Sequence, residues 1–266
     1  MQITRITNND YKPNCKGISR VVYKPNVTPI AFEKIAVKHK NTSWMYRPKI
    51  SVCMRTYNYF SHAFNGVDKV NVYNYGCSLG YEAYSYIIWL LSGKKKNPDK
   101  FLPIIAKDYD EDIIKAAKNF QLLLDEDEMS KIKMVAGKKK YRDFLEPGMY
   151  SKYLILGENH RGMLTNLTEK LTDNVQFSVA DIRKDYKNIE PEKSIVMASN
   201  FWPYMEKEDR YELAENLYKQ LDKGSCVKID EFDNSINWLD DKITTTQLLV
   251  KVGFKRTAIN DFVLKK

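Results

Sequence analysis

Residues 70–93, VNVYNYGCSLGYEAYSYIIWLLSG, constrain the fold of this chain more than any other segment. An alternating run of β-branched and aromatic residues leads into the glycine-bracketed turn 76–80, and apolar residues at helical spacing then continue to Gly93. The segment therefore predicts a strand over 70–75, a tight turn, and a helix over 81–91. A unit of this kind brings backbone N–H groups and a helix N-terminus to a polar ligand.

Three interpretations of the turn compete: a nucleotide-type cofactor loop, a serine nucleophile elbow, or a turn without chemistry. Gly76-Cys77-Ser78-Leu79-Gly80 fits the elbow pattern G-x-S-x-G. A hydrolase of that type needs an acid and then a histidine after the serine, and only His160 follows Ser78. His160 precedes most of the remaining predicted strands, so the order of residues disfavours a hydrolase.

The rest of the chain alternates between strand and helix patterns, which predicts an α/β fold. We expect a mostly parallel sheet with helices on both faces, closed by a C-terminal antiparallel hairpin. The expected strands are 102–106, 175–179, 194–198, 225–229, 254–258 and 262–265, and the expected helices are 111–124, 207–221 and 240–252. Residues 66–266 would form this domain, with a small β-insert at about 150–165 whose turn is Glu158-Asn159. Residues 1–65, with a helical pattern near 30–38, would form a small N-terminal region.

Composition limits the class of protein and its partners. The formal charge of +9 favours acidic partners, including nucleic acid or an acidic protein surface. Four cysteines without a C-x-x-C pair indicate reduced thiols and a cytoplasmic protein. Three histidines without metal-binding spacing predict no metal site, and the longest apolar run, 86–91, is too short to span a membrane.

Polar side chains follow the predicted parallel strands, where ligands of open α/β sheets bind. Asp108, after the second strand, suits both hydroxyls of a ribose, although it could instead cap the helix that follows. Asp181, after the third strand, suits an adenine amine, or is simply a loop acid. Asn200 precedes the aromatic run 201–204, which would either face a ligand or plug the core.

The order of these motifs resembles that of the S-adenosylmethionine-dependent methyltransferases that act on chemotaxis-receptor glutamates. The loop pattern of that family, roughly C-S-x-G-x-E-x-Y-S, matches residues 77–85, and its A-T-D-I-D matches 106–110. Its V-x-F strand matches 175–177, and its R-N-x-x-x-Y-F motif corresponds to 199–205. The resemblance covers about residues 55–232 and implies a Rossmann-like class I methyltransferase fold with S-adenosylmethionine as cofactor.

The resemblance also implies roles for individual residues. Glu82 and the backbone of the 76–80 loop would hold the methionine end of the cofactor, Asp108 the ribose, and Asn200 and Phe201 would line the cofactor. Tyr204, with Asn200, would serve the methyl acceptor, which in the family is a protein glutamate. The cofactor-binding residues implied are Gly76, Cys77, Ser78, Gly80, Glu82, Asp108, Tyr109, Asp181, Ile182, Asn200 and Phe201.

Two departures from the family keep other functions open. Ser199 stands where the family has an arginine, and Asn58-Tyr59-Phe60-Ser61 occupies the place of its T-x-F-F-R segment, whose arginine serves the same pocket. One alternative is therefore a relative that binds the cofactor or a peptide without catalysis. Another is a nucleic-acid amino-methyltransferase, because 200–204 loosely resembles the N-P-P-Y loop that grips a target amine.

Overall fold

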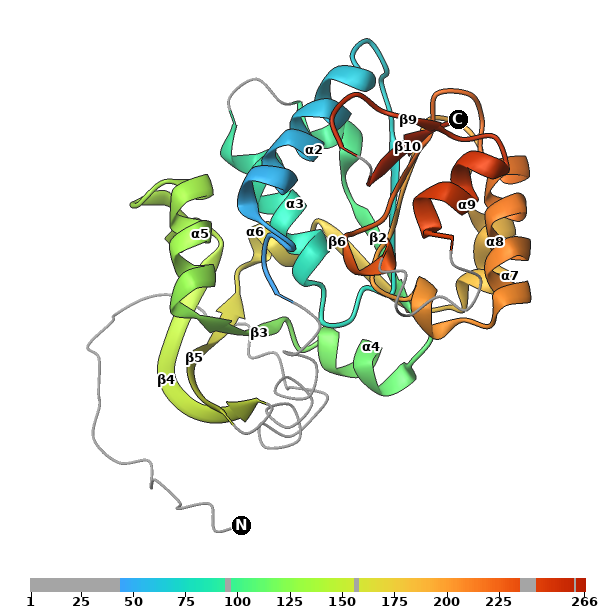
Figure 1. Ribbon diagram of the computed structural model, residues 1–266. Helices are drawn as coiled ribbons and strands as arrows, with labels where there is room; N and C mark the ends of the chain where they lie inside the picture. Colours follow the sequence, from blue (N-terminus) through green and yellow to red (C-terminus); the bar gives the residue numbers. More distant parts are fainter. Residues whose placement is uncertain (1–43, 94–96, 156–157, 235–242, 261) are drawn as a thin grey trace.

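A seven-stranded sheet organises the chain, whose computed structural model describes residues 44–93, 97–155, 158–234, 243–260 and 262–266 (Figure 1). The strand order is β6-β2-β1-β7-β8-β10-β9. The strands β6, β2, β1, β7 and β8 are mutually parallel, and β10 is antiparallel to both of its neighbours. Their bounds are β1 (Asn71–Tyr75), β2 (Ile104–Asp108), β6 (Val175–Val179), β7 (Ser194–Ala198), β8 (Cys226–Lys228), β9 (Lys255–Arg256) and β10 (Val263–Lys265). The mostly parallel sheet and its antiparallel C-terminal pair are confirmed.

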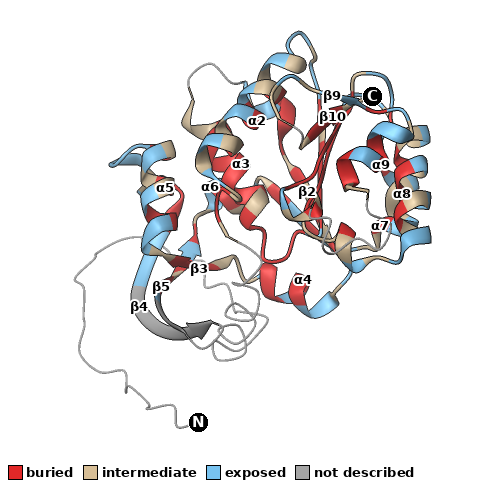
Figure 2. Ribbon diagram, viewed as in Figure 1, coloured by how far each residue is buried: buried red, intermediate tan, exposed pale blue. Residues whose placement is uncertain are grey.

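Helices cover both faces of this sheet, as predicted. On one face lie α2 (Ile50–Ala63) and α3 (Tyr81–Ser92), and on the other lie α7 (Ile182–Asp185), α8 (Lys207–Gln220) and α9 (Thr245–Lys251) (Figure 1). Alternation along β1 divides the core accordingly, because Val72 packs in the cluster that contains α3 while Tyr73 and Tyr75 pack in the cluster that contains α8. The inward faces of these helices are buried (Figure 2).

The predicted helix over 111–124 is wrong in its second half. Helix α4 (Glu111–Ala117) stops after two turns, and Phe120, at a φ of 55°, leads into strand β3 (Gln121–Asp125). The three leucines 122–124 continue the helical pattern in sequence, but here they pair with strand β5. Asp125 then begins α5 (Glu126–Ala136) with a capping box that includes Glu128, so tertiary pairing and a strong cap override the local pattern.

The β-insert is larger than predicted and its turn lies elsewhere. A separate three-stranded sheet has the order β3-β5-β4, with β4 (Leu145–Ile155) and β5 (Glu158–Leu167) as its long hairpin. Ile155 pairs with Glu158, so the predicted turn residues Glu158 and Asn159 belong to β5. The connection falls on residues 156–157, outside the described residues. The polar pair 158–159 is therefore part of a strand and pairs with residues 154–155.

Helix α2 was not predicted, and it packs directly on α3. Tyr57 of α2 lies with its ring centroid 4.7 Å from that of Tyr86 and 5.6 Å from that of Trp89. Residues 45–64 thus share the core of the sheet. The helical pattern near 30–38 lies outside the described residues, as does the start of the helix predicted over 240–252, and a separate N-terminal region stays a prediction.

The remaining elements are short connections around the two sheets. They are α6 (Glu169–Thr172) and the 3-10 turns η1 (Pro98–Phe101), η2 (Lys140–Asp143), η3 (Tyr186–Asn188), η4 (Trp202–Tyr204) and η5 (Phe232–Asn234). Within the described residues, no helix is both long enough and apolar enough to cross a membrane.

Candidate active site

The glycine-bracketed turn forms a tight loop between β1 and α3, at the point where the strand order reverses. Gly76, Ser78 and Gly80 all have positive φ values, of 64°, 51° and 92°. A Cβ on Gly80 would lie 2.7 Å from the ring of Tyr84 and 2.8 Å from that of Phe177, so only glycine fits there. The loop is also tied to β2, because the Cys77 N–H donates to the carbonyl of Lys107 at 3.0 Å. Its backbone and the N-terminus of α3 therefore form a fixed cradle at the carboxyl edge of the sheet.

Asp108 faces this loop from the end of β2. Its Oδ2 accepts the backbone N–H of Ser78 at 3.0 Å, and its Oδ1 accepts that of Asp110 at 3.2 Å. The helix cap is a different residue, since Asp110 accepts the N–H groups of Asp112 and Ile113 at the start of α4. Of these two acids, Asp108 therefore faces the loop, and Asp110 caps helix α4.

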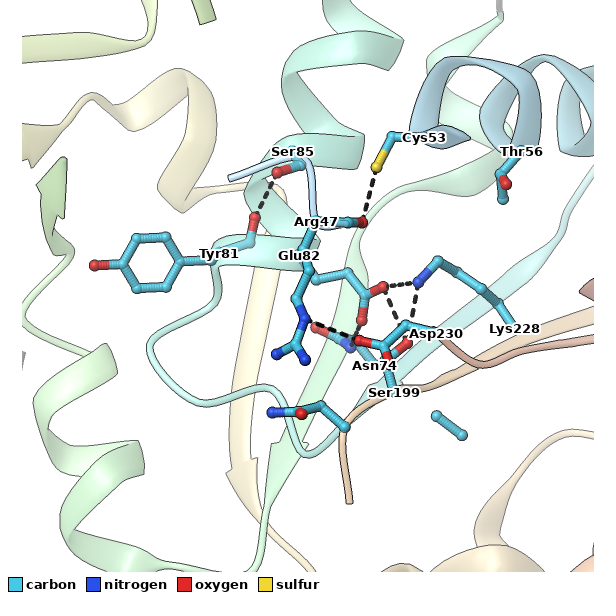
Figure 3. Close-up of polar contacts among 12 residues, drawn as sticks. Arg47, Cys53, Thr56, Asn74, Tyr81, Glu82, Ser85, Ser199, Lys228 and Asp230 are labelled. Carbon is cyan, nitrogen blue, oxygen red and sulfur yellow. Dashed lines mark hydrogen bonds and ion pairs between the residues drawn. The ribbon is translucent and has the colours of Figure 1, made fainter. Parts of the chain in front are cut away.

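Glu82, in the first turn of α3, is the centre of a polar network (Figure 3). Its Oε2 accepts the amide of Asn74 at 2.9 Å, and its Oε1 accepts the hydroxyl of Ser199 at 3.3 Å. Lys228, at the end of β8, forms an ion pair with Glu82 Oε1 and donates to Ser199 Oγ at 3.0 Å. Burial disfavours the charge of Lys228, but the carboxylates of Glu82 and Asp230 together raise its pKa above the ordinary value.

A second ion pair closes the same pocket. Arg47, just before α2, lies with its Nε 3.0 Å from Asp230 Oδ2 (Figure 3). Its guanidinium lies 4.5 Å from the ring centroid of Trp44 and 5.8 Å from that of Phe232. We name Glu82, Lys228, Arg47 and Asp230 the ion-pair cluster. These four residues line one cavity of about 40 Å³, together with Gly76, Cys77, Ser199 and Asn200.

The sequence reasoning missed both cations of the ion-pair cluster. It expected no cation at the position of Ser199, and the structure brings Lys228 there from the neighbouring strand. It also placed the missing second arginine at 58–61, whereas Phe60 of that segment is buried in the core and Arg47 reaches the pocket. Two signals were present: a lysine inside the apolar run 226–229, and an arginine directly after the large apolar residues 44–46.

The segment after β7 combines a buried plug with an exposed ring. Asn200, at a φ of 69°, donates its backbone N–H to Asp233 Oδ2 at 2.8 Å. Phe201 lies against Gly76, where a Cβ would come within 2.9 Å of its ring. Trp202 is fully buried and donates its indole N–H to the carbonyl of Ala198, so it alone is the core plug. Tyr204 is 66% exposed at the mouth, with its ring 5.8 Å from that of Phe232.

The predicted adenine contacts lie at the ends of β2 and β6. Asp181 caps α7 by accepting the N–H of Arg183, and Ile182 is buried behind it. The Arg183 side chain also pairs with the Asp181 carboxylate, and this hydrogen bonding lowers the pKa of Asp181. Tyr109, directly after Asp108, is 78% exposed. Asp181 and Tyr109 are thus open to solvent, whereas Ile182 is buried.

A buried acid, Asp233, is hydrogen-bonded to the segment around Asn200. Asp233 accepts the backbone N–H groups of Asn200 and Asp230. Burial, with a further effect from Asp230, raises the pKa of Asp233 well above its ordinary value. The two hydrogen bonds that Asp233 accepts hold the loop around Asn200 in place.

Ser78 shows no sign of an activated nucleophile. Its Oγ is buried and makes no hydrogen bond with any described part of the chain. The side chain of His160 lies outside the described residues. A buried hydroxyl without a partner, inside a cradle of backbone N–H groups, can instead donate a hydrogen bond to a polar ligand.

Comparison with known proteins identifies a family for this arrangement. The sequence pattern of the family described as "CheR methyltransferase, SAM binding domain" matches residues 56–234. No curated protein matches the chain.

Three methyltransferases are among the solved structures to which the chain is similar. A TehB-like SAM-dependent methyltransferase from Corynebacterium glutamicum is 12% identical with a TM-score of 0.43, and covers 89% of this chain and 96% of its own. A SAM-dependent methyltransferase from Archaeoglobus fulgidus is 16% identical with a TM-score of 0.36, over 79% and 71% of the two chains. The magnesium protoporphyrin IX methyltransferase of Synechocystis PCC 6803 is 10% identical with a TM-score of 0.36, over 80% and 81%.

Proposed function

The chain belongs to the CheR methyltransferase family and is an S-adenosylmethionine-dependent methyltransferase, and from this premise we propose that it methylates a side-chain carboxylate of a protein. The observation that carries the proposal is the position of Arg47. Arg47 lines the pocket together with Trp44, and its guanidinium lies 4.5 Å from the ring centroid of Trp44 and 5.8 Å from that of Phe232. The ring of the exposed Tyr204 lies 5.8 Å from that of Phe232. A planar cation at the mouth of a methyl-transfer site suits a carboxylate acceptor.

The residues of the pocket fit the cofactor. The cradle of positive-φ residues offers backbone N–H groups, and the buried Ser78 hydroxyl has no hydrogen-bond partner in the described chain. In this proposal Glu82 binds the ammonium of the methionine end, and Asp108 binds the ribose hydroxyls. Tyr109, Asp181 and Ile182 surround the adenine, while Gly76 and Phe201 form the wall beside the cofactor.

The chemistry asks this chain to position groups more than to move protons. S-adenosylmethionine supplies a methyl group already activated on a sulfonium. A carboxylate oxygen would attack the methyl carbon as the methyl–sulfur bond breaks, which would give a methyl ester and S-adenosylhomocysteine. An ionised carboxylate would need no base, and the described lining of the pocket contains no histidine. Arg47 and Tyr204 hold the acceptor in line, and Trp44 and Phe232 exclude water from the mouth.

A methyl-ester assay tests the acceptor class. The full chain is incubated with methyl-tritiated S-adenosylmethionine and a protein extract of its own organism. We expect protease-sensitive label that mild alkali releases as volatile methanol, because carboxyl methyl esters hydrolyse under conditions that leave N-methyl amines intact. Arg47→Met should lose this label. Alkali-stable, nuclease-sensitive label would show that the acceptor is a nucleic-acid amine instead.

Trp202 bears on the nucleic-acid alternative. A base-gripping loop needs an aromatic face free to stack on the target base. Trp202 is fully buried, which leaves Tyr204 as the exposed ring of the 201–204 run. Tyr204 is thus the ring that would stack on a base, and the methyl-ester assay distinguishes the two acceptors. A cytoplasmic protein with an acidic surface is the partner we propose.

A further inference from the structure

The ion-pair cluster fills the part of the pocket that the methionine end of the cofactor would occupy. The cavity there is about 40 Å³, well below the roughly 300 Å³ or more of a typical ligand pocket. Glu82 and Lys228 already form an ion pair there, so a ligand whose ammonium binds Glu82 competes with Lys228 for the same carboxylate. Binding of that ammonium therefore displaces the internal pair.

Lys228 is the more enclosed of the two cations. Its neighbours in sequence, Val227 and Ile229, are fully buried, and its own side chain is 6% exposed, against 17% for Arg47. A buried ammonium without a partner is costly, and both of its contacts, Glu82 and Ser199, belong to the pocket wall. Since burial opposes its charge and the carboxylates around it prevail, the pKa of Lys228 is raised and the group stays protonated at neutral pH.

The charges of the described lining balance. Two cations, Lys228 and Arg47, face two carboxylates, Glu82 and Asp230. A zwitterion adds one positive and one negative group, so the balance is kept when it binds. A ligand with only an ammonium would take Glu82 and leave Lys228 with Asp230 alone, which is already paired with Arg47.

The two cations are not equivalent. Arg47 lies at the mouth, 17% exposed, stacked near Trp44 and held by Asp230, which is itself 2% exposed. Lys228 lies deeper and is bonded to Glu82, the residue assigned to the cofactor ammonium. An ammonium and a carboxylate on the same carbon atom need partners that are adjacent, and Glu82 and Lys228 are adjacent.

We propose that Lys228 is a specificity residue that binds the α-carboxylate of the cofactor, and that the internal pair Glu82–Lys228 is exchanged for two pairs with the ligand. Lys228 thereby supplies from β8 the cation that β7 lacks at Ser199. In the apo pocket, the ammonium of Lys228 and the carboxylate of Glu82 stand in for the two charged groups of the ligand. Ligands that lack the α-carboxylate therefore bind weakly. This inference rests on the cofactor site described under the proposed function.

The test compares two ligands that differ by one group. Calorimetric titration of the full chain with S-adenosylhomocysteine and with its decarboxylated analogue, which keeps the ammonium, gives a ratio of dissociation constants. For the wild-type chain we expect the intact ligand to bind more tightly. Lys228→Met should lower this preference by about 10- to 100-fold, the range for losing one charge-assisted hydrogen bond. Lys228→Arg, which keeps a cation, should retain most of it.

Controls separate this role from a structural one. Lys100→Met removes another buried lysine, which donates to the carbonyl of Phe64 at the far end of β2, and should leave the preference unchanged. If Lys228→Met fails to fold because Glu82 loses its counterion, Glu82→Gln/Lys228→Met removes both charges, and the preference must still fall.

The outcomes are distinct. If Lys228→Met, or the double variant in its place, keeps the wild-type preference for S-adenosylhomocysteine over the decarboxylated analogue, Lys228 only neutralises Glu82. That result would overturn this inference but not the cofactor site. Failure of the wild-type chain to bind S-adenosylhomocysteine would overturn the cofactor site and the inference together.

Discussion

The carboxylate of Asp108 accepts the backbone N–H of Ser78 across the ends of β2 and β1, at 3.0 Å. This hydrogen bond joins the loop to the acid that follows the neighbouring strand. Because Asp110 also donates to Asp108, the carboxylate is oriented before any ligand arrives. The residue proposed to bind the ribose is therefore pre-organised together with the loop proposed to hold the methionine end.

Asp108→Ala should weaken the binding of S-adenosylhomocysteine by at least about 10-fold, because hydrogen bonds to a charged group contribute about 1.5–3 kcal/mol. Calorimetric titration measures the loss. Asp110→Ala is the matched control, since it removes the cap of α4 and should cost about 1 kcal/mol of stability while changing the affinity little. Equal affinity of Asp108→Ala and wild type would show that the ribose site is misplaced.

Gly76→Ala tests the wall of the cradle. Gly76 has a φ of 64°, and an added Cβ would lie 2.9 Å from the ring of Phe201, which is stacked on Trp202. We expect both a loss of stability of about 1–2 kcal/mol from the backbone conformation and a weaker affinity for S-adenosylhomocysteine. Gly66→Ala has a similar φ of 76° and open space around it, so it should lose stability without losing affinity. Denaturation and calorimetric titration of both variants measure the stability and the affinity. Equal affinities of Gly76→Ala and Gly66→Ala for S-adenosylhomocysteine would contradict this prediction.

The sheet and its cradle were predictable because their signals are local. The alternation before Gly76, the glycines at 76 and 80 and the apolar helix after them all agree, and each describes the conformation that its own residues adopt. Asp108, Asp181 and Asn200 could be placed from topology, because parallel strands bring their carboxyl ends to one edge.

The ion-pair cluster was not predictable in the same way. Arg47 and Lys228 are 181 residues apart in sequence, and their meeting with Glu82 depends on how α2 and β8 pack. The same holds for β3, whose leucines have a helical pattern and become a strand only because β5 pairs with them. Where long-range contacts decide, local patterns mislead.

Asp185 provides a prediction for the dependence of stability on pH. It accepts hydrogen bonds from Tyr75, at 2.5 Å, and Lys107, at 2.6 Å. Burial opposes its charge, but the hydrogen bonds from Lys107, Tyr75 and Asn188 lower its pKa overall. A lowered pKa stabilises the fold fully above the pKa of the unfolded state, near 3.9, and this stabilisation disappears as the pH falls through the folded-state value.

Asp185→Asn should therefore lower the free energy of unfolding by about 1–3 kcal/mol at pH 7, and the difference from wild type should shrink as the pH falls from 5 to 3. Urea denaturation across that range measures it. Asp112→Asn, which disrupts an exposed contact 3.7 Å from Lys115, should change stability by less than about 0.5 kcal/mol. A difference for Asp185→Asn that stays constant down to pH 3 would exclude the ionised carboxylate as its source.

Tyr204 separates acceptor positioning from cofactor binding. Its ring lies 5.8 Å from that of Phe232 at the mouth, and it does not line the cavity of the ion-pair cluster. Tyr204→Phe keeps the ring and removes the hydroxyl that would orient the acceptor. We expect methyl transfer to the extracted protein acceptor to slow by roughly 100-fold, the order for losing one positioned donor, with an unchanged affinity for S-adenosylhomocysteine. Tyr141→Phe, in η2 away from the mouth, should change neither quantity. A parallel loss of affinity in Tyr204→Phe would instead place this hydroxyl in the cofactor site.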